Sequence, residues 1–289
     1  MQSESAIFAR DPILYFADGN IVLSALTSEK KGTLFRIHKS VLSLHSPVFA
    51  DMFALPEPPS GVNDAYDGVP LVHLHDDAIH VRELLQTFYQ PTSLNLVRYD
   101  PNTPDKIRGC LLLAKKYQIK SLYDHLVKHF RADWPQSLQE WDALEEEIGL
   151  RLNQFQLADI NTEFDINYVD DVFPEPASAI RLARELDIPE ILPAAFYQLS
   201  RLDVTHDRDR WADYTGYDDF YTSLREGERS AHWSLLTSEE LIHVFLGREG
   251  LQRFAQSLQW KFRHVACTKC CSGPIQDFFD SSSGTPTTC

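Results

Sequence analysis

The sequence predicts an α+β protein, in which a small sheet flanked by helices is followed by a mostly α-helical second half. Short apolar segments bounded by turn residues lie between residues 21 and 74, which is typical of strands. From there on, apolar residues recur every three or four positions, as in amphipathic helices. The 289 residues are 43% hydrophobic and 24% charged, which excludes wholesale disorder and a dense disulfide scaffold.

The first strands follow turn signals. Asp18-Gly19-Asn20 is a turn sequence, and Ile21-Val22-Leu23 after it predicts a short strand. Leu34 to His38 alternates apolar and polar residues, which predicts a second strand paired with the first. Leu71 to Leu74 predicts a third strand.

Helices are predicted by caps and by apolar spacing. Ser46 is a good N-cap, and Pro47 suits the first helical position, where no N–H is needed. Trp134-Pro135 is expected to end the last helix of this half. The predicted helices contain Val48–Phe53, Ile79–Phe88, Ile107–Tyr117 and Leu122–Phe130.

These elements resemble a BTB/POZ domain over residues 17–134, and the version is similar to the fungal set of such proteins. Four ordered segments carry the resemblance: Asp18–Leu23, Phe35–Leu42, Ser46–Phe53 and Ala114–Ile119. The resemblance implies a module that binds itself and other proteins and is not an enzyme. It also implies that a cullin scaffold is among the candidate partners.

The resemblance also suggests where partners bind. In dimeric members an acidic residue at the first strand and a basic residue after the second form a buried charged pocket, and Asp18 and Lys39 match these positions. Met52 and Phe53, on the apolar face of the next helix, complete the candidate dimer surface. The alternative is that Asp18 only caps the turn and that Lys39 is solvated.

Two departures from the family pattern limit what the resemblance implies. Only 17 residues precede Asp18 and Pro12 interrupts them, so an N-terminal strand exchanged between subunits is not expected. Gln90 to Pro104 contains no Glu, whereas cullin-binding members often carry a hydrophobic-x-Glu motif there.

The second half, residues 135–262, is predicted to be an acidic helical domain. Residues 136–289 carry 13 basic and 27 acidic groups, against 14 and 15 before them. Such acidity argues against nucleic-acid binding. Capping boxes at Ser137-x-x-Glu140 and Thr237-x-x-Glu240 predict two helix starts, and Gly247 is expected to end the second of these helices. Leu251 to Leu258 then predicts a last helix.

An internal repeat links the two halves. Leu111–Ile119 aligns with Ile180–Ile188 at an offset of 69 residues. Each segment reads as a helix, a tight turn at Ile and a second helix, which predicts two helical hairpins. The second helix of the later hairpin is expected to begin near Pro193.

The tail, residues 263–289, holds the strongest metal-like pattern. His264, Cys267, Cys270 and Cys271 could together bind Zn²⁺. Against zinc, structural sites usually draw their ligands from two separated pairs, and four ligands within eight residues would strain the backbone. A cluster of inert thiols is the favoured interpretation, and a redox dithiol is a third alternative.

The leading hypothesis is a protein-interaction adaptor without a cofactor, in the cytoplasm or nucleus. No signal peptide or apolar segment of membrane-spanning length is visible, and five cysteines, an odd number, do not suggest a secreted disulfide framework. The alternative hypothesis keeps the first half as a docking unit and makes the second half a zinc-binding or enzymatic domain.

Overall fold

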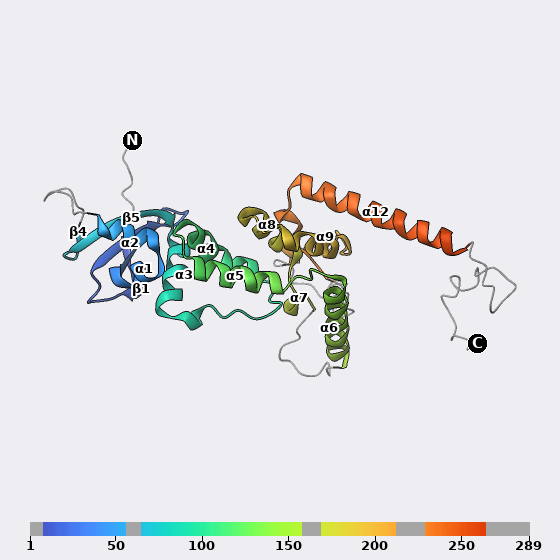
Figure 1. The fold of residues 1–289 in the computed structure, drawn as a ribbon, viewed down its shortest axis with the longest axis horizontal. Helices are drawn as coiled ribbons and strands as arrows, with labels where there is room; N and C mark the ends of the chain where they lie inside the picture. The colour runs from blue at the N-terminus through green and yellow to red at the C-terminus, as the bar shows by residue number, and fades with distance from the viewer. Residues whose placement is uncertain (1–7, 56–64, 158–168, 212–228, 264–289) are drawn as a thin grey trace.

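The computed structural model describes residues 8–55, 65–157, 169–211 and 229–263. The mixed sheet lies at one end of an elongated molecule, and the C-terminal helices extend from it (Figure 1). The α+β class and the helical second half are therefore confirmed. No helix in these ranges is both long and apolar enough to cross a membrane.

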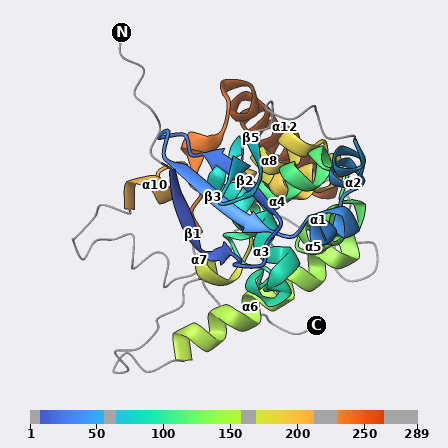
Figure 2. The same ribbon diagram turned by 90° about the vertical axis from the view of Figure 1, so that its left-hand side faces the viewer.

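The sheet has five strands in the order β1-β3-β2-β5-β4. β2 and β3 form an antiparallel hairpin with Ile21 opposite Ile37, and β2 pairs with β5 in parallel. Figure 2 looks toward these strands from the sheet end of the molecule. The strands are β1 (Phe8–Tyr15), β2 (Ile21–Leu26), β3 (Gly32–Ile37), β4 (Ala65–Tyr66) and β5 (Val69–Asp77).

Strand β1 was not predicted, because Pro12 was taken to interrupt this segment. It pairs in parallel with β3 within the same chain. Pro12 is tolerated because β1 is an edge strand whose register shifts between Arg10 and Tyr15. There the buried Asp11 replaces the strand ladder: its Oδ1 accepts the N–H groups of Ile13 and Leu14, both at 2.9 Å.

Five helices complete the first half of the chain. They are α1 (Lys39–His45), α2 (Pro47–Ala54), α3 (Ala78–Tyr89), α4 (Thr103–Lys116) and α5 (Lys120–Ala132). Inward residues of the sheet, among them Leu23 and Phe35, pack on α1, α2, α3 and the C-terminal half of α4 in one core. Helix α4 also faces away from the sheet, where Ile107 and Leu111 belong to a second core.

That second core joins the two halves of the chain. Residues of α4, α5 and Trp134 pack there with residues of α8, α9 and α12. Ion pairs border it: the Arg108 guanidinium donates two bonds of 2.6 Å to Glu185, and Arg131 binds Glu190. The C-terminal helices are therefore built directly onto the α4–α5 hairpin.

The described C-terminal elements are all helical. They are α6 (Leu138–Leu157), α7 (Val169–Val172), α8 (Pro176–Leu186), α9 (Leu192–Ser200), α10 (Arg208–Trp211) and α12 (Ser238–Arg263), with 3₁₀ turns at Pro189–Ile191 and Trp233–Leu235. At the start of α12 the Thr237–Glu240 capping box is confirmed, since Glu240 Oε2 accepts from Thr237 N at 2.8 Å and Thr237 Oγ1 accepts from Glu240 N at 3.2 Å. Gly247 does not end this helix, contrary to prediction, because α12 continues through it to Arg263.

Candidate protein-interaction surface

The candidate surface is carried by α1 and α2, which cover one end of the sheet. Ser46 sets the start of α2: its Oγ accepts the Phe49 N–H at 3.2 Å and donates to Tyr117 O at 2.7 Å. Since Tyr117 follows α4, this one hydroxyl fixes α2 against the end of a helix 71 residues away. Phe49 also stacks on the Tyr117 ring at 4.5 Å between centroids.

Lys39 and Phe53 of the candidate set lie together. The Lys39 ammonium sits over the Phe53 ring, 5.6 Å from its centroid, and the Lys39 backbone N–H donates to Asn20 Oδ1 at 2.8 Å. Phe53 and Met52 are half-buried, each with one side on the sheet core. A cation over an aromatic face is a contact that strengthens when water is excluded from it.

Asp18 lies on the surface beside a different partner. Its side chain is 85% exposed, and its carboxylate is 3.4 Å from His38 Nε2. The other ring nitrogen of His38, Nδ1, lies 3.0 Å from the Tyr89 hydroxyl, which also accepts the His38 backbone N–H. Burial raises the pKa of Tyr89. Asp18 and Lys39 thus have separate described contacts, and their joining in a buried pocket remains a prediction.

Sequence reasoning missed two apolar residues of this surface. Leu44 at the end of α1 is 80% exposed, and Leu55 just after α2 is 68% exposed. Neither belongs to an apolar periodicity, so only the structure shows that they point outward. With Met52 and Phe53 they give α1 and α2 an apolar outer side, next to the Lys39 charge.

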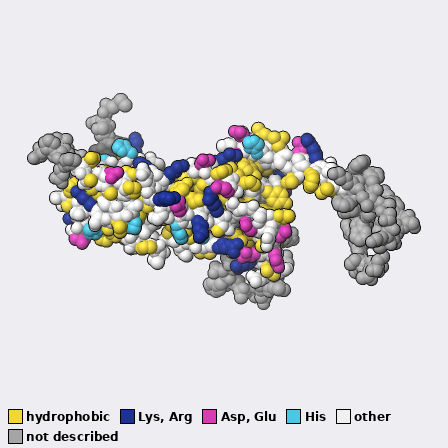
Figure 3. Space-filling model, in the orientation of Figure 1, with side chains coloured by type: hydrophobic (Ala, Val, Ile, Leu, Met, Phe, Trp, Pro, Cys, Tyr) yellow, Lys and Arg dark blue, Asp and Glu magenta, His cyan; other side chains and the backbone are white. Residues whose placement is uncertain are grey.

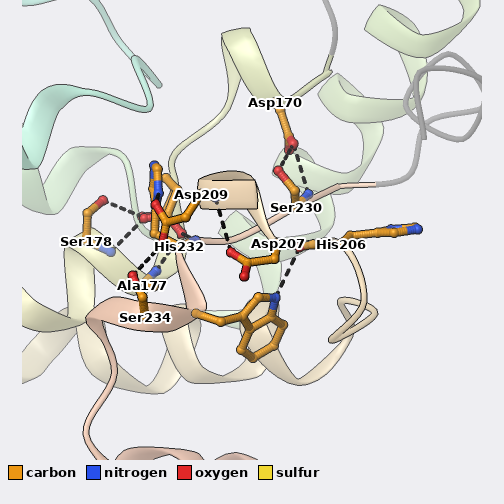
Figure 4. Close-up of polar contacts among 11 residues, drawn as sticks. Asp170, Ala177, Ser178, His206, Asp207, Asp209, Ser230, His232 and Ser234 are labelled. Carbon is orange, nitrogen blue, oxygen red and sulfur yellow. Dashed lines mark hydrogen bonds and ion pairs between the residues drawn. The ribbon is translucent and has the colours of Figure 1, made fainter. Parts of the chain in front are cut away.

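A second group of polar side chains lies in the C-terminal half (Figure 4). Glu175 is buried and caps α8, because its carboxylate accepts the N–H groups of Ala177 at 2.9 Å and Ser178 at 2.6 Å. Asp170 accepts from the backbone and hydroxyl of Ser230 at 2.9 and 2.5 Å. Carboxylates from two helices thereby anchor the segment around residue 230, which has little secondary structure of its own.

His232, Asp209 and Ser234 have the residue types of a hydrolase triad but another geometry. His232 Nδ1 lies 2.6 Å from Asp209 Oδ1, and the Ser234 hydroxyl donates to the second oxygen of Asp209 (Figure 4). A nucleophilic serine would instead contact the far nitrogen of the imidazole. Bonds from Ser234 and His232 lower the pKa of Asp209 and stabilise its ionised form. The arrangement holds α10 to the Trp233–Leu235 turn and does not activate a nucleophile.

A pocket of about 800 Å³ opens between α6, α9 and α12. Three arginines line it, and all are engaged within the chain: Arg201 with Glu145, Arg229 with Pro174 O, and Arg248 with Ser200 O and Leu202 O. These bonds hold the helices around the pocket together.

The predicted metal residues fall elsewhere. His264, Cys267, Cys270 and Cys271 lie outside the described residues, so their role remains a prediction. Within the described ranges, no three His, Cys, Asp or Glu side chains are grouped as a metal ion would require. The remaining cysteine, Cys110, is buried, and burial raises the pKa of its thiol to about 12, so it is an inert core residue.

A small mixed sheet with two helical hairpins and no described catalytic constellation is the architecture of a binding module. Comparison with known families gives it a name: residues 21–133 are a BTB/POZ domain. Such domains are typically protein–protein interaction and dimerisation modules and are generally non-catalytic. None of the curated proteins compared matches the chain. The narrower resemblance to the fungal set stays a prediction.

Proposed function

We propose that this protein is an interaction adaptor whose BTB/POZ domain self-associates through the outer side of α1 and α2. The observation that carries the proposal is the exposure of Leu44 and Leu55 beside Lys39 and Phe53, on a domain of a protein-binding family. Apolar residues around a charged group are what the centre of a protein interface offers. In the proposed dimer, Asp18 of one copy approaches Lys39 of the other, which forms the charged pocket.

The proposal assigns the C-terminal helices to a second partner. The shared core makes them continuous with α4 and α5, so a protein bound to these helices is held at a fixed position relative to the BTB surface. Bridging of such a partner to a cullin-type ubiquitin ligase is the narrower form of the proposal. Binding of a purified cullin N-terminal domain in gel filtration would support it, and its failure to bind leaves self-association standing.

Light scattering of the purified full chain tests self-association. We expect twice the chain mass, and we expect Leu44→Asp to give a monomer, because a charge replaces an exposed apolar group at the interface. Ile79→Asp is the matched control, since Ile79 is 57% exposed on α3 of the same domain. Unchanged mass for Leu44→Asp, or equal loss for Ile79→Asp, would contradict the proposed surface.

The charged pocket has its own test. Asp18→Lys and Lys39→Asp should each weaken the dimer, and a mixture of the two variants should form a heterodimer. In that mixture one copy supplies two cations and the other supplies two carboxylates. A mixture that stays monomeric would show that these residues do not meet across the interface.

A further inference from the structure

Helix α12 has apolar residues on two sides. One side packs into the protein: Val244 is buried in the core with α9, and Arg248 beside it donates to Ser200 O at 2.8 Å. The other side carries Ile242, Phe245 and Leu246, which are 55%, 54% and 59% exposed. Three and four residues apart, they form one continuous patch on the helix.

The patch is the outer end of a stack of helices. Helix α8 packs on α4, and α12 packs on α9, so each layer covers the apolar side of the layer before it. In the described part of the chain, α12 is the last layer and extends away from the body (Figure 1). A helix with apolar residues on opposite sides is typical of an interior layer. Hydrophobic side chains are visible along it in the space-filling view (Figure 3).

We infer that this side of α12 is covered by α12 of a second copy, aligned antiparallel. The residues on it recur at the alternating spacing of four and three that two-stranded coiled coils require. They are Ile242, Leu246, Glu249, Arg253 and Gln256. All five are exposed, so a partner helix reaches them without rearrangement of the fold.

The charges of α12 select the antiparallel direction. Residues 238–250 hold three glutamates and one arginine, whereas the basic residues of 251–263, Arg253, Lys261 and Arg263, are accompanied by no acidic residue. An antiparallel pair therefore places the acidic half of each helix against the basic half of the other. A parallel pair would place like charges side by side.

One register satisfies both the spacing and the charges. Centred on residue 251, it sets Glu249 of each copy opposite Arg253 of the other, and Leu246 opposite Gln256. Within one chain Glu249 and Arg253 already form an ion pair of 2.6 Å on the exposed surface. Two such pairs meeting at the centre of the dimer fix its register, as polar residues do in coiled coils.

The test separates this contact from association of the BTB domain by using full chains that carry Leu44→Asp. In this background, Glu249→Lys and Arg253→Glu are each expected to weaken dimerisation about tenfold in sedimentation equilibrium. Both variants lose the pair within the helix. A mixture of the two is expected to recover dimers at least as tight as those of the parent chain, because every pairing between copies is then attractive.

Two results would overturn the inference. One is a mixture of the two variants that stays as weakly associated as each alone, since the charge effect would then lie within the helix. The other is unchanged association of Ile242→Asp together with loss of association in Phe254→Asp. Phe254, 62% exposed on a different side of α12, is the matched control and should have no effect. A chain with Leu44→Asp that is strictly monomeric at high concentration would equally exclude the pairing, whatever the fate of the BTB surface.

Discussion

Gln118 and Asp187 occupy the same position in two helical hairpins that pack on each other. Both have left-handed backbone conformations, with φ of 55° and 61°. In each hairpin the following isoleucine donates its N–H at 2.8 Å to the alanine carbonyl five residues before it: Ile119 to Ala114 O, and Ile188 to Ala183 O. The repeat in the sequence is therefore a repeat of one helix-ending turn, and the isoleucine that follows it is buried in both hairpins.

The left-handed turn predicts an unusual stabilising substitution. A side chain in this conformation costs about 1 kcal/mol that glycine does not pay. Gln118→Gly should therefore raise the stability by up to about that amount, and Gln118→Val should lower it further than any loss of contact explains. Thermal unfolding followed by circular dichroism measures both. Gln86→Gly, inside α3, is the control of opposite sign, expected to cost about 1 kcal/mol. Equal destabilisation at both positions would contradict the argument.

The hairpins were predictable because their signal is local. The spacing of Leu111 to Ile119 and of Ile180 to Ile188 specifies both an apolar helix side and the turn, so their prediction is confirmed by the structure. Helix α9 begins at Leu192, one residue from the predicted start at Pro193. The N-cap at Ser46 is confirmed for the same reason.

What could not be predicted depends on residues distant in sequence. β1 exists because β3 offers it an edge and because Asp11 satisfies the backbone around Pro12. Gly247 was wrongly expected to end a helix, because a glycine is tolerated where the backbone hydrogen bonds continue on both sides. The pairing of Asp18 with His38 could not be told from a pairing with Lys39, since the two basic residues are adjacent in the sequence.

The bridge between α2 and Tyr117 gives a prediction about stability. Ser46→Ala removes the cap of α2 and leaves the Tyr117 carbonyl without this donor, and both groups are buried. The expected loss is about 1 to 2 kcal/mol in chemical unfolding. Ser40→Ala, on the exposed side of α1, is the control and should change stability by less than about 0.5 kcal/mol. A loss for Ser46→Ala no larger than that of the control would show that the bridge contributes nothing.

The buried pair of Arg229 and Asp170 predicts a larger effect. Arg229 Nε lies 3.5 Å from Asp170 Oδ1, and its guanidinium donates to Pro174 O at 2.6 Å. Arg229→Met leaves the Asp170 carboxylate buried without a cation, which should cost about 3 kcal/mol or more in unfolding of the C-terminal half. Adding Asp170→Asn should restore part of the loss, because the uncompensated charge is gone. Arg151→Met, on the exposed side of α6, is the control. No recovery in the double variant would assign the loss to packing alone.

Asp133 predicts how stability depends on pH. Its side chain is buried at the end of α5, and its Oδ1 accepts the Tyr99 N–H at 3.0 Å. Burial raises the pKa of Asp133, although the Tyr99 bond and the charges of His129 and Arg98 oppose the shift. A raised pKa means that the folded state favours the protonated acid. The contribution of Asp133 to stability is thus fully present below its unfolded pKa and is lost as the pH rises through its folded pKa.

Asp133→Asn isolates this contribution, because Asn keeps the acceptor for Tyr99 but cannot ionise. The melting temperature of the variant relative to the unmodified chain should rise between about pH 4 and about pH 7, since only the unmodified chain ionises a buried group. Asp124→Asn, on the exposed side of the same helix, controls for the chemical change and should have a small effect throughout. A difference for Asp133→Asn that falls as the pH rises would mean that the neighbouring cations outweigh burial, and the sign of the shift would then be reversed.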